Sequence, residues 1–255
     1  MNMRAAGGGE SIEPGDAGFD VRFFTPSRRE TYAVWQNASR EVAFEDAPVV
    51  RPFVSRPGKR VAPGWWWSST TGRLVHFGSA AMRTQVMLAD QDPRVHALAC
   101  RPLELRWQED GRVRTHAPQL MLRLRDGGGV LADCTVRGEP SARQRWLARV
   151  VGWACAGVGW QYWLLGPVER VYRLNVTWLS RYRHPRCHGG MERARALQAV
   201  FCGGRPLVEG AAEVGDPIGV LPAVFHALWS GVLAADLSVP LHERTQVTAV
   251  ASVQE

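Results

Sequence analysis

The feature that most constrains the fold of this 255-residue chain is a change in the spacing of its apolar residues. Between residues 95 and 165 the apolar positions mostly alternate, whereas residues 206–229 repeat them at intervals of three and four. Alternation is typical of half-buried strands, and the longer spacing is typical of amphipathic helices. The sequence therefore predicts an α/β domain with a mixed sheet, followed by a separate domain of paired helices.

Local signals define the expected elements of the α/β domain. Residues 79–89 have helical spacing, and two hairpins are expected at the turns Asp110-Gly111 and Asp126-Gly127. Ser141 is placed to cap a helix that runs to about Cys155, and residues 160–165 form a buried strand. This order of elements is that of a restriction-endonuclease-like core, in which acidic residues from the first helix and two central strands converge.

Residues 206–250 read as a winged helix, with two helices separated by Asp216-Pro217 and followed by two short strands. The outward face of the second helix offers only His226 and Ser230 for contact with base edges. Docking of a partner protein fits this segment at least as well as DNA reading does.

The other segments complete the expected domain organisation. Residues 1–19 are Gly-rich and are expected to form a disordered leader. Residues 20–62 are expected to form an extended N-terminal arm with one or two strands, and residues 63–170 the α/β domain. Residues 171–205 are expected to form a connector with a basic loop.

The chain has a net charge of +7 and a sequence pI of about 9.7, and all but one of its basic residues, Lys59, are arginines. Guanidinium groups bind phosphate oxygens through two donors, so this balance favours a nucleic acid partner. A genomic bias toward arginine codons explains the composition equally well. Arg181, Arg183 and Arg186 are the best candidates for phosphate contacts, with a solvated loop as the alternative.

Several classes of protein are disfavoured. No apolar run is long enough to span a bilayer, and the N-terminus has no apolar signal core, which indicates a cytoplasmic protein without a membrane partner. The five cysteines are odd in number and widely spaced, which disfavours a disulfide framework and a zinc site.

Several long and unusual segments resemble the TnsA-like endonuclease subunits of heteromeric transposases, over roughly residues 21–250. These segments are RPFVSRPGKR, PGWWWSSTTGRLV, MLADQDPRV, HAPQ, GVLADC, LNVTWLSRYRHPRC and LVEGAAEVGDPIGVLPAVFHALWSGVLAADLSVPL. The resemblance implies a restriction-endonuclease-like catalytic domain and a C-terminal winged helix. It further implies a subunit that cuts transposon ends beside a DDE-type transposase and an ATPase regulator.

The chain departs from this family where the catalytic residues belong. Gly78 and Met82 stand where the family has two glutamates, and Gln119 stands in place of an aspartate. Thr135 replaces a lysine or arginine, and Asp133 is the one acid retained. Because Mg²⁺ requires oxygen ligands that include carboxylates, these changes remove both the metal ligands and the catalytic cation.

Other residues could compensate for these losses. Arg137 lies two positions beyond Thr135, and Glu104 or Asp90 could supply a carboxylate from elsewhere. His116 fits a metal ligand less well than it fits a hydrogen-bonded structural histidine. Residues 65–67, three consecutive tryptophans, fit either a core cluster or a surface for base stacking.

The sequence therefore favours a catalytically degenerate TnsA-like subunit that binds double-stranded DNA and the partner transposase proteins and needs no cofactor. The first alternative is an active endonuclease with relocated ligands and Mg²⁺. The second alternative is a stand-alone DNA-binding regulator.

Overall fold

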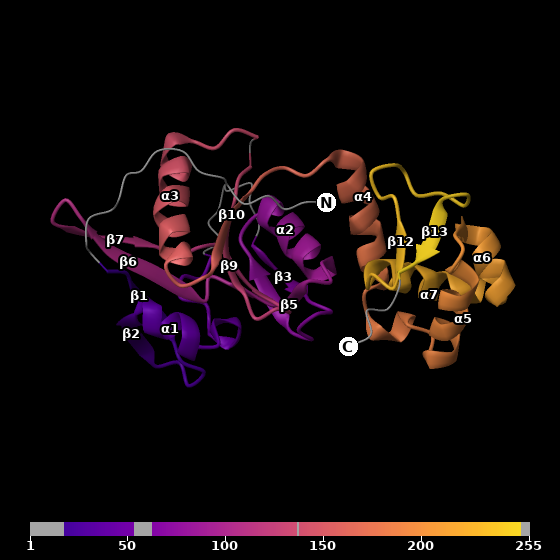
Figure 1. Ribbon diagram of the computed structural model, residues 1–255, viewed down its shortest axis with the longest axis horizontal. Helices are drawn as coiled ribbons and strands as arrows, with labels where there is room; N and C mark the ends of the chain where they lie inside the picture. Colours follow the sequence, from indigo (N-terminus) through magenta and orange to yellow (C-terminus); the bar gives the residue numbers. More distant parts are fainter. Residues whose placement is uncertain (1–17, 54–62, 137, 251–255) are drawn as a thin grey trace. The chain divides into compact units, whose positions relative to one another are not determined.

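The computed structural model describes residues 18–53, 63–136 and 138–250, and the expected leader falls almost entirely outside them. The described chain is a mixed α/β protein whose elements are labelled in Figure 1. It divides into two compact units. The first holds residues up to 89 together with 94–167, and the second holds residues 90–93 together with those from 168 onward.

One sheet of the first unit contains the strands in which the catalytic acids were expected. It comprises β5 (Val95–Cys100), β8 (Leu120–Leu124), β9 (Gly129–Cys134) and β10 (Gln161–Leu165), in the order β10-β9-β8-β5. β9 and β10 are parallel, whereas the other neighbours are antiparallel. The expected mixed sheet is therefore confirmed.

A second four-stranded sheet includes the strands expected within residues 20–62. β1 (Asp20–Phe24) pairs with β2 (Glu30–Val34) on one side and with β6 (Leu103–Glu109) on the other, and β7 (Arg112–His116) completes the sheet. Val21, Phe23 and the preceding Phe19 are buried. The segment is therefore part of the sheet and core, because its alternating apolar side chains bury against strands about 80 residues further along the chain.

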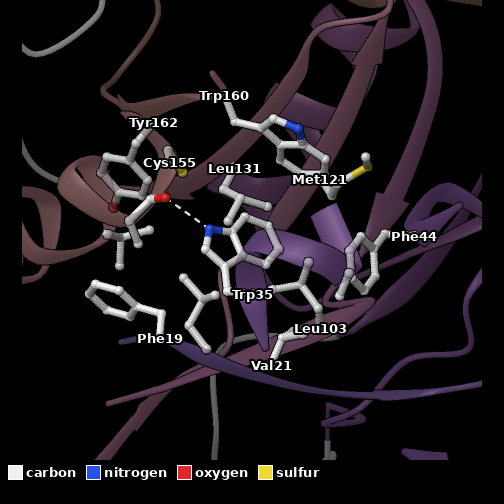
Figure 2. Packing of buried hydrophobic residues seen from close by; sticks show 14 of the residues in the cluster. Phe19, Val21, Trp35, Phe44, Leu103, Met121, Leu131, Cys155, Trp160 and Tyr162 are labelled. Atoms are coloured by element: carbon white, nitrogen blue, oxygen red, sulfur yellow. Dashed lines mark hydrogen bonds between the residues drawn. The ribbon is translucent and has the colours of Figure 1, made fainter. Parts of the chain in front are cut away.

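Figure 2 shows the core that joins the two sheets. It includes residues from both sheets, from α1 (Trp35–Glu41) and from α3 (Ala142–Ala156). The indole of Trp35 is buried at its centre, and its Nε1 donates a hydrogen bond to the carbonyl oxygen of Ala154 at 2.8 Å. Satisfying the one polar atom of the indole allows the whole ring to be buried without a desolvation penalty.

The local elements agree with the sequence signals. Asp110 and Gly111 have φ values of 50° and 70°, as a tight turn between β6 and β7 requires. The Ser141 side chain accepts a hydrogen bond from the amide of Gln144, whose side chain in turn caps the amide of Ser141. This capping box begins α3 at the residue expected. The predicted helix at residues 79–89 is α2 (Ala80–Gln91), and it follows the hairpin of β3 (Gly64–Trp67) and β4 (Leu74–Phe77).

Gly129 allows the indole of Trp160 to lie against the start of β9. A Cβ atom at Gly129 would lie 2.1 Å from the Trp160 ring. We expect Gly129→Ala to lower the free energy of unfolding by about 1–3 kcal/mol, because the indole must move out of a packed core. Urea unfolding measures this, with Gly138→Ala as the control, since a Cβ there meets nothing within 4 Å. Equal stability of the two variants would contradict the prediction.

The second unit contains more than the expected pair of helices. Its helices are α4 (Arg170–Leu179), α5 (Met191–Phe201), α6 (Leu207–Val214) and α7 (Pro217–Trp229), with the short helices η2 (Ser180–Tyr182) and η3 (Pro185–Cys187). β11 (Arg205–Pro206), β13 (Gln246–Ala249) and β12 (Leu233–Ala235) form its sheet in that order. The expected connector, residues 171–205, is instead largely helical and packs into this unit through Val176, Leu179, Leu197 and Phe201, all buried.

Within the described ranges, no helix combines the length and the apolar character that crossing a bilayer would require.

Candidate functional site

Asp133, the retained acid, lies near the C-terminal end of β9 and is enclosed by hydrogen-bond donors. Its Oδ2 atom lies 2.8 Å from the hydroxyl of Tyr162, which donates to it, and 2.7 Å from Nε2 of His116. Its Oδ1 atom accepts the amide of Gln119 at 3.1 Å. Because both oxygens are occupied and the residue is 8% exposed, the carboxylate serves as the centre of an internal network.

Tyr162 and His116 hold this carboxylate from two different sheets. Burial, with a smaller contribution from the neighbouring carboxylate, raises the pKa of Tyr162 well above its usual range, so its hydroxyl remains a donor. His116 ends β7 and contributes the hydrogen bond expected of a structural histidine. The network therefore joins β7, β9 and β10 around one buried charge.

The two positions of the expected site nearest Asp133 in the sheet region, Gln119 and Thr135, also make contacts inside the protein. Oε1 of Gln119 accepts the backbone amide of Cys134 at 2.9 Å, so the neutral residue is bound to the adjacent strand. The Thr135 side chain is buried, and its hydroxyl lies 3.4 Å from the carbonyl oxygen of Leu165. The structure thus brings Gln119, Asp133 and Thr135 together, with Asp133 in β9 and the other two just outside β8 and β9, each in an internal contact.

The helix position of the expected site is filled by an aromatic ring. A Cβ atom at Gly78 would lie 2.2 Å from the ring of Phe53. The guanidinium of Arg101 lies over the same Phe53 ring, 3.8 Å from the ring centroid. Met82 is buried, and its sulfur accepts the amide of Gly78 at 3.3 Å. The space that a carboxylate at residue 78 would need is therefore occupied.

The residues considered as replacements do not rebuild a metal site. Glu104 is buried and forms ion pairs with Arg22, at 3.0 Å, and with Arg51. Asp90 belongs to the second unit, and Arg137 lies outside the described residues. Among the residues that the structure describes, no group of three or more His, Cys, Asp or Glu could hold a metal ion.

The three buried cysteines do not offer an alternative site. All five cysteines are free, and Cys100, Cys134 and Cys155 are buried. Burial raises the pKa of each of these three thiols to about 12, so they remain protonated at neutral pH. A protonated thiol is a poor nucleophile and a poor metal ligand.

The second helix of the expected DNA-reading pair, α7, is mostly enclosed. Its buried residues are Val220, Ala223, Val224, Phe225, Ala227, Leu228 and Trp229. Nδ1 of His226 lies 2.8 Å from the carbonyl oxygen of Tyr182, and burial lowers the pKa of the imidazole. Ser230 is exposed at the C-terminal end of the helix. His226 is therefore a neutral residue in an internal contact, whereas Ser230 remains accessible.

The three arginines chosen for phosphate contact are not equivalent. Arg181 and Arg186 are exposed. Arg183 is half-buried and donates a hydrogen bond to the carbonyl oxygen of Ser180 at 2.6 Å, which ties it to η2. Two of the three guanidinium groups are thus available to a phosphate.

Positive charge is unevenly divided between the two units. The sequence of the second unit has nine arginines and no lysine against ten acidic residues, which gives a formal charge of −1. Since the whole chain carries +7, the first unit carries +8. Long-range attraction to a polyanion therefore originates in the first unit.

No protein-family model and no curated protein matches the chain.

Sequence reasoning missed Phe53, which fills the space beside Gly78, and Arg101, which lies over the Phe53 ring. Neither residue belongs to the catalytic pattern, and Phe53 lies 25 positions before Gly78 in a Pro- and Arg-rich segment. The one available signal was the glycine itself, because a glycine in place of a long side chain leaves room for another group.

Proposed function

We propose that the chain is a nuclease-like subunit of the TnsA type that has lost strand cleavage and is retained to bind transposon-end DNA and partner transposase proteins. In this proposal the first unit has a restriction-endonuclease-like core and the second contains a winged helix. The arrangement of α2, β8, β9, α3 and β10 supports the first assignment. The pair α6 and α7, followed by β12 and β13, supports the second.

One observation carries the loss of cleavage: the positions that would hold catalytic groups each have a structural role instead. Asp133 accepts hydrogen bonds from its neighbours, Gln119 binds the backbone of β9, and Phe53 fills the space at Gly78. The described residues therefore do not fit a divalent cation, whose binding would require open carboxylate oxygens. A scaffold without catalysis retains binding as its function.

Free arginines of the first unit support DNA binding. Arg112 lies on β7, and Arg143 and Arg149 lie on α3. All three are exposed, and none has a hydrogen-bond or ion-pair partner among the described residues. β7 and α3 belong to one packed region, because Trp107 of β6 and Trp146 of α3 are in ring contact with centroids 5.9 Å apart. Unpaired guanidinium groups gain most from a phosphate, since no existing ion pair has to be broken.

The salt dependence of duplex binding tests this assignment. We expect the combined variant Arg112→Ala, Arg143→Ala and Arg149→Ala to lower the slope of log Kd against log salt by about 2–3 units, roughly 0.9 for each lost phosphate contact. We expect Arg181→Ala with Arg186→Ala to lower it by at most about 2 units. Fluorescence anisotropy of a labelled duplex over a salt series measures both slopes.

Arg73→Ala is the matched control for these variants. Its side chain is 56% exposed, but it already forms an ion pair with Asp46 at 2.6 Å, so we expect the slope to change by less than about 0.5. An unchanged slope in both arginine variants would contradict DNA binding through these surfaces. A duplex Kd that does not vary with salt would contradict the DNA-binding function as a whole.

The second unit is better suited to protein contact than to reading bases. Its formal charge is −1 and α7 is buried along most of its length, so few groups remain to enter a groove. We therefore assign this unit to the DDE-type transposase subunit or the ATPase regulator. We expect the complex between the second unit and its protein partner to persist at salt concentrations that release duplex DNA from the chain.

A further inference from the structure

One face of the β3–β4 hairpin carries a stack of rings that begins with an exposed tryptophan and ends in a charged group. Trp65 and His76 are directly opposite each other on the two strands, and their rings are stacked with centroids 4.5 Å apart and an interplanar angle of 19°. The ring of Phe53 meets His76 edge-on at 5.1 Å, and the guanidinium of Arg101 lies 3.8 Å from the Phe53 ring centroid. The order of the stack is thus Trp65, His76, Phe53 and Arg101.

Trp65 leaves a flat aromatic surface open to solvent. Its side chain is 61% exposed, whereas Trp66, which points to the opposite face of the hairpin, is 4% exposed. Since one face of the Trp65 indole lies on His76, its other face remains uncovered. The stacked His76 ring holds the exposed indole in one orientation, so a planar group can stack on the indole without first ordering it.

The Arg101 guanidinium, at the other end of the stack, interacts electrostatically with the carboxylate of Asp133 but is not paired with it. One of its terminal nitrogens donates to the carbonyl oxygen of Arg51 at 3.2 Å, and it has no ion pair with a described residue. His76 adds no further charge at neutral pH, because burial and the nearby Arg101 lower the pKa of its imidazole. The stack therefore combines a planar apolar surface with one unpaired guanidinium group.

A nucleotide has the two chemical features that complement this stack, a planar base and an anionic phosphate. Stacking on an aromatic side chain is favourable for every base, and a guanidinium group binds the phosphate of the same strand. A base within a duplex offers no free face, so the ligand must be unpaired. The +8 charge of the first unit favours a polyanion over an apolar protein surface.

We infer that the Trp65–His76–Phe53–Arg101 stack is a binding site for an unpaired base of single-stranded DNA. This inference rests on the proposed DNA-binding function and extends it from duplex to unpaired strands. Trp65 provides the surface on which the base stacks, and Arg101 binds a phosphate of the neighbouring backbone. His76 and Phe53 position these two groups.

Binding of a fluorescein-labelled oligothymidylate of about ten nucleotides tests the inference. We expect Trp65→Ala to raise its Kd by roughly 5- to 150-fold, the loss that removal of one stacked base produces. Trp65→Phe, which keeps an aromatic face, should stay within about threefold of the unmodified chain. Neither substitution should change the Kd for a blunt duplex by more than about twofold, because a duplex has no unpaired base.

Trp153→Ala is the matched control, because Trp153 is 46% exposed in the same unit but lies outside the stack. We expect it to leave oligothymidylate binding unchanged. Oligothymidylate binding that Trp65→Ala does not weaken would overturn the inference and would leave an apolar protein partner as the occupant of the hairpin face. Duplex binding without any oligothymidylate binding would overturn the inference alone, whereas failure to bind either DNA would also contradict the proposed function.

Discussion

Replacing Asp133 by Ala is expected to lower the free energy of unfolding of the first unit by about 3–5 kcal/mol, the range found when one partner of a buried charged network is removed. The substitution leaves Tyr162, His116 and the amide of Gln119 without their common acceptor. Each unsatisfied buried donor costs about 1–3 kcal/mol, partly recovered where water reaches it. The measurement is urea or thermal unfolding, followed by circular dichroism.

Two further variants separate the network from a general effect of removing an acid. Asp126→Ala removes an exposed aspartate on the turn between β8 and β9, whose Oδ1 accepts the amide of Gly128 at 2.8 Å, and we expect a loss of about 1 kcal/mol. Tyr162→Phe removes one donor but leaves the carboxylate with two, so we expect about 1–2 kcal/mol. If Asp133→Ala were no more destabilising than Asp126→Ala, the enclosed network would have no structural role.

This expectation changes how cleavage assays with Asp133 variants should be interpreted. Loss of nicking in Asp133→Ala would not identify a catalytic carboxylate, because the variant is expected to lose much of its folded population. Asp133→Asn is the better probe, since the amide retains one oxygen that accepts the amide of Gln119.

The elements that the sequence predicted well are those determined by neighbouring residues. The β6–β7 turn follows from Asp110 and Gly111, which tolerate positive φ, and the start of α3 follows from the Ser141–Gln144 capping box. These signals lie within four residues of the feature that they determine. They are therefore visible in a single sequence.

The features that the sequence did not predict depend on residues far apart in the chain. The pairing of Val21 with Leu105 made the expected arm a strand of a sheet, although nothing near residue 21 specifies its partner. The helices α4 and α5 were also not predicted, because the run of basic residues Arg181, Arg183 and Arg186 between them indicated a loop. Burial of Val176 and Leu179 against the rest of the second unit explains why a helix forms there.

The candidate site likewise combines features that the sequence predicted with features that depend on residues far apart in the chain. The sequence identified Gly78, Gln119 and Thr135 as departures from the family pattern and Asp133 as the position that agrees with it, and the structure brings Gln119, Asp133 and Thr135 close together. The contacts made beside Gly78 could not be predicted, because Phe53 and Arg101 come from segments outside the catalytic pattern. The orientation of His226 toward Tyr182 was likewise hidden, since helical periodicity does not reveal a contact with a separate short helix.

The second prediction with a large expected effect is that restoring DNA cleavage requires removal of the Phe53 side chain. We expect the unmodified chain to leave transposon-end DNA uncut with Mg²⁺ or Mn²⁺, because in the proposed nuclease-like site Gly78, Met82 and Gln119 supply no carboxylate and Thr135 supplies no cation. We expect the combination Gly78→Glu, Gln119→Asp and Thr135→Lys to remain inactive as well. A Cβ at residue 78 already lies 2.2 Å from the Phe53 ring, so a glutamate there cannot reach the strand residues.

Adding Phe53→Ala to these three substitutions removes the ring that occupies the space at residue 78. We expect this four-residue variant to bind Mn²⁺, as measured by isothermal titration. We also expect it to nick DNA at least about a hundredfold faster than the three-residue variant. This ratio corresponds to about 2.7 kcal/mol of transition-state stabilisation. Phe53→Ala alone is the control, and it should neither bind Mn²⁺ nor nick. Equal nicking by the three- and four-residue variants would show that Phe53 does not obstruct the site, and metal-dependent nicking by the unmodified chain would instead support an endonuclease with relocated ligands.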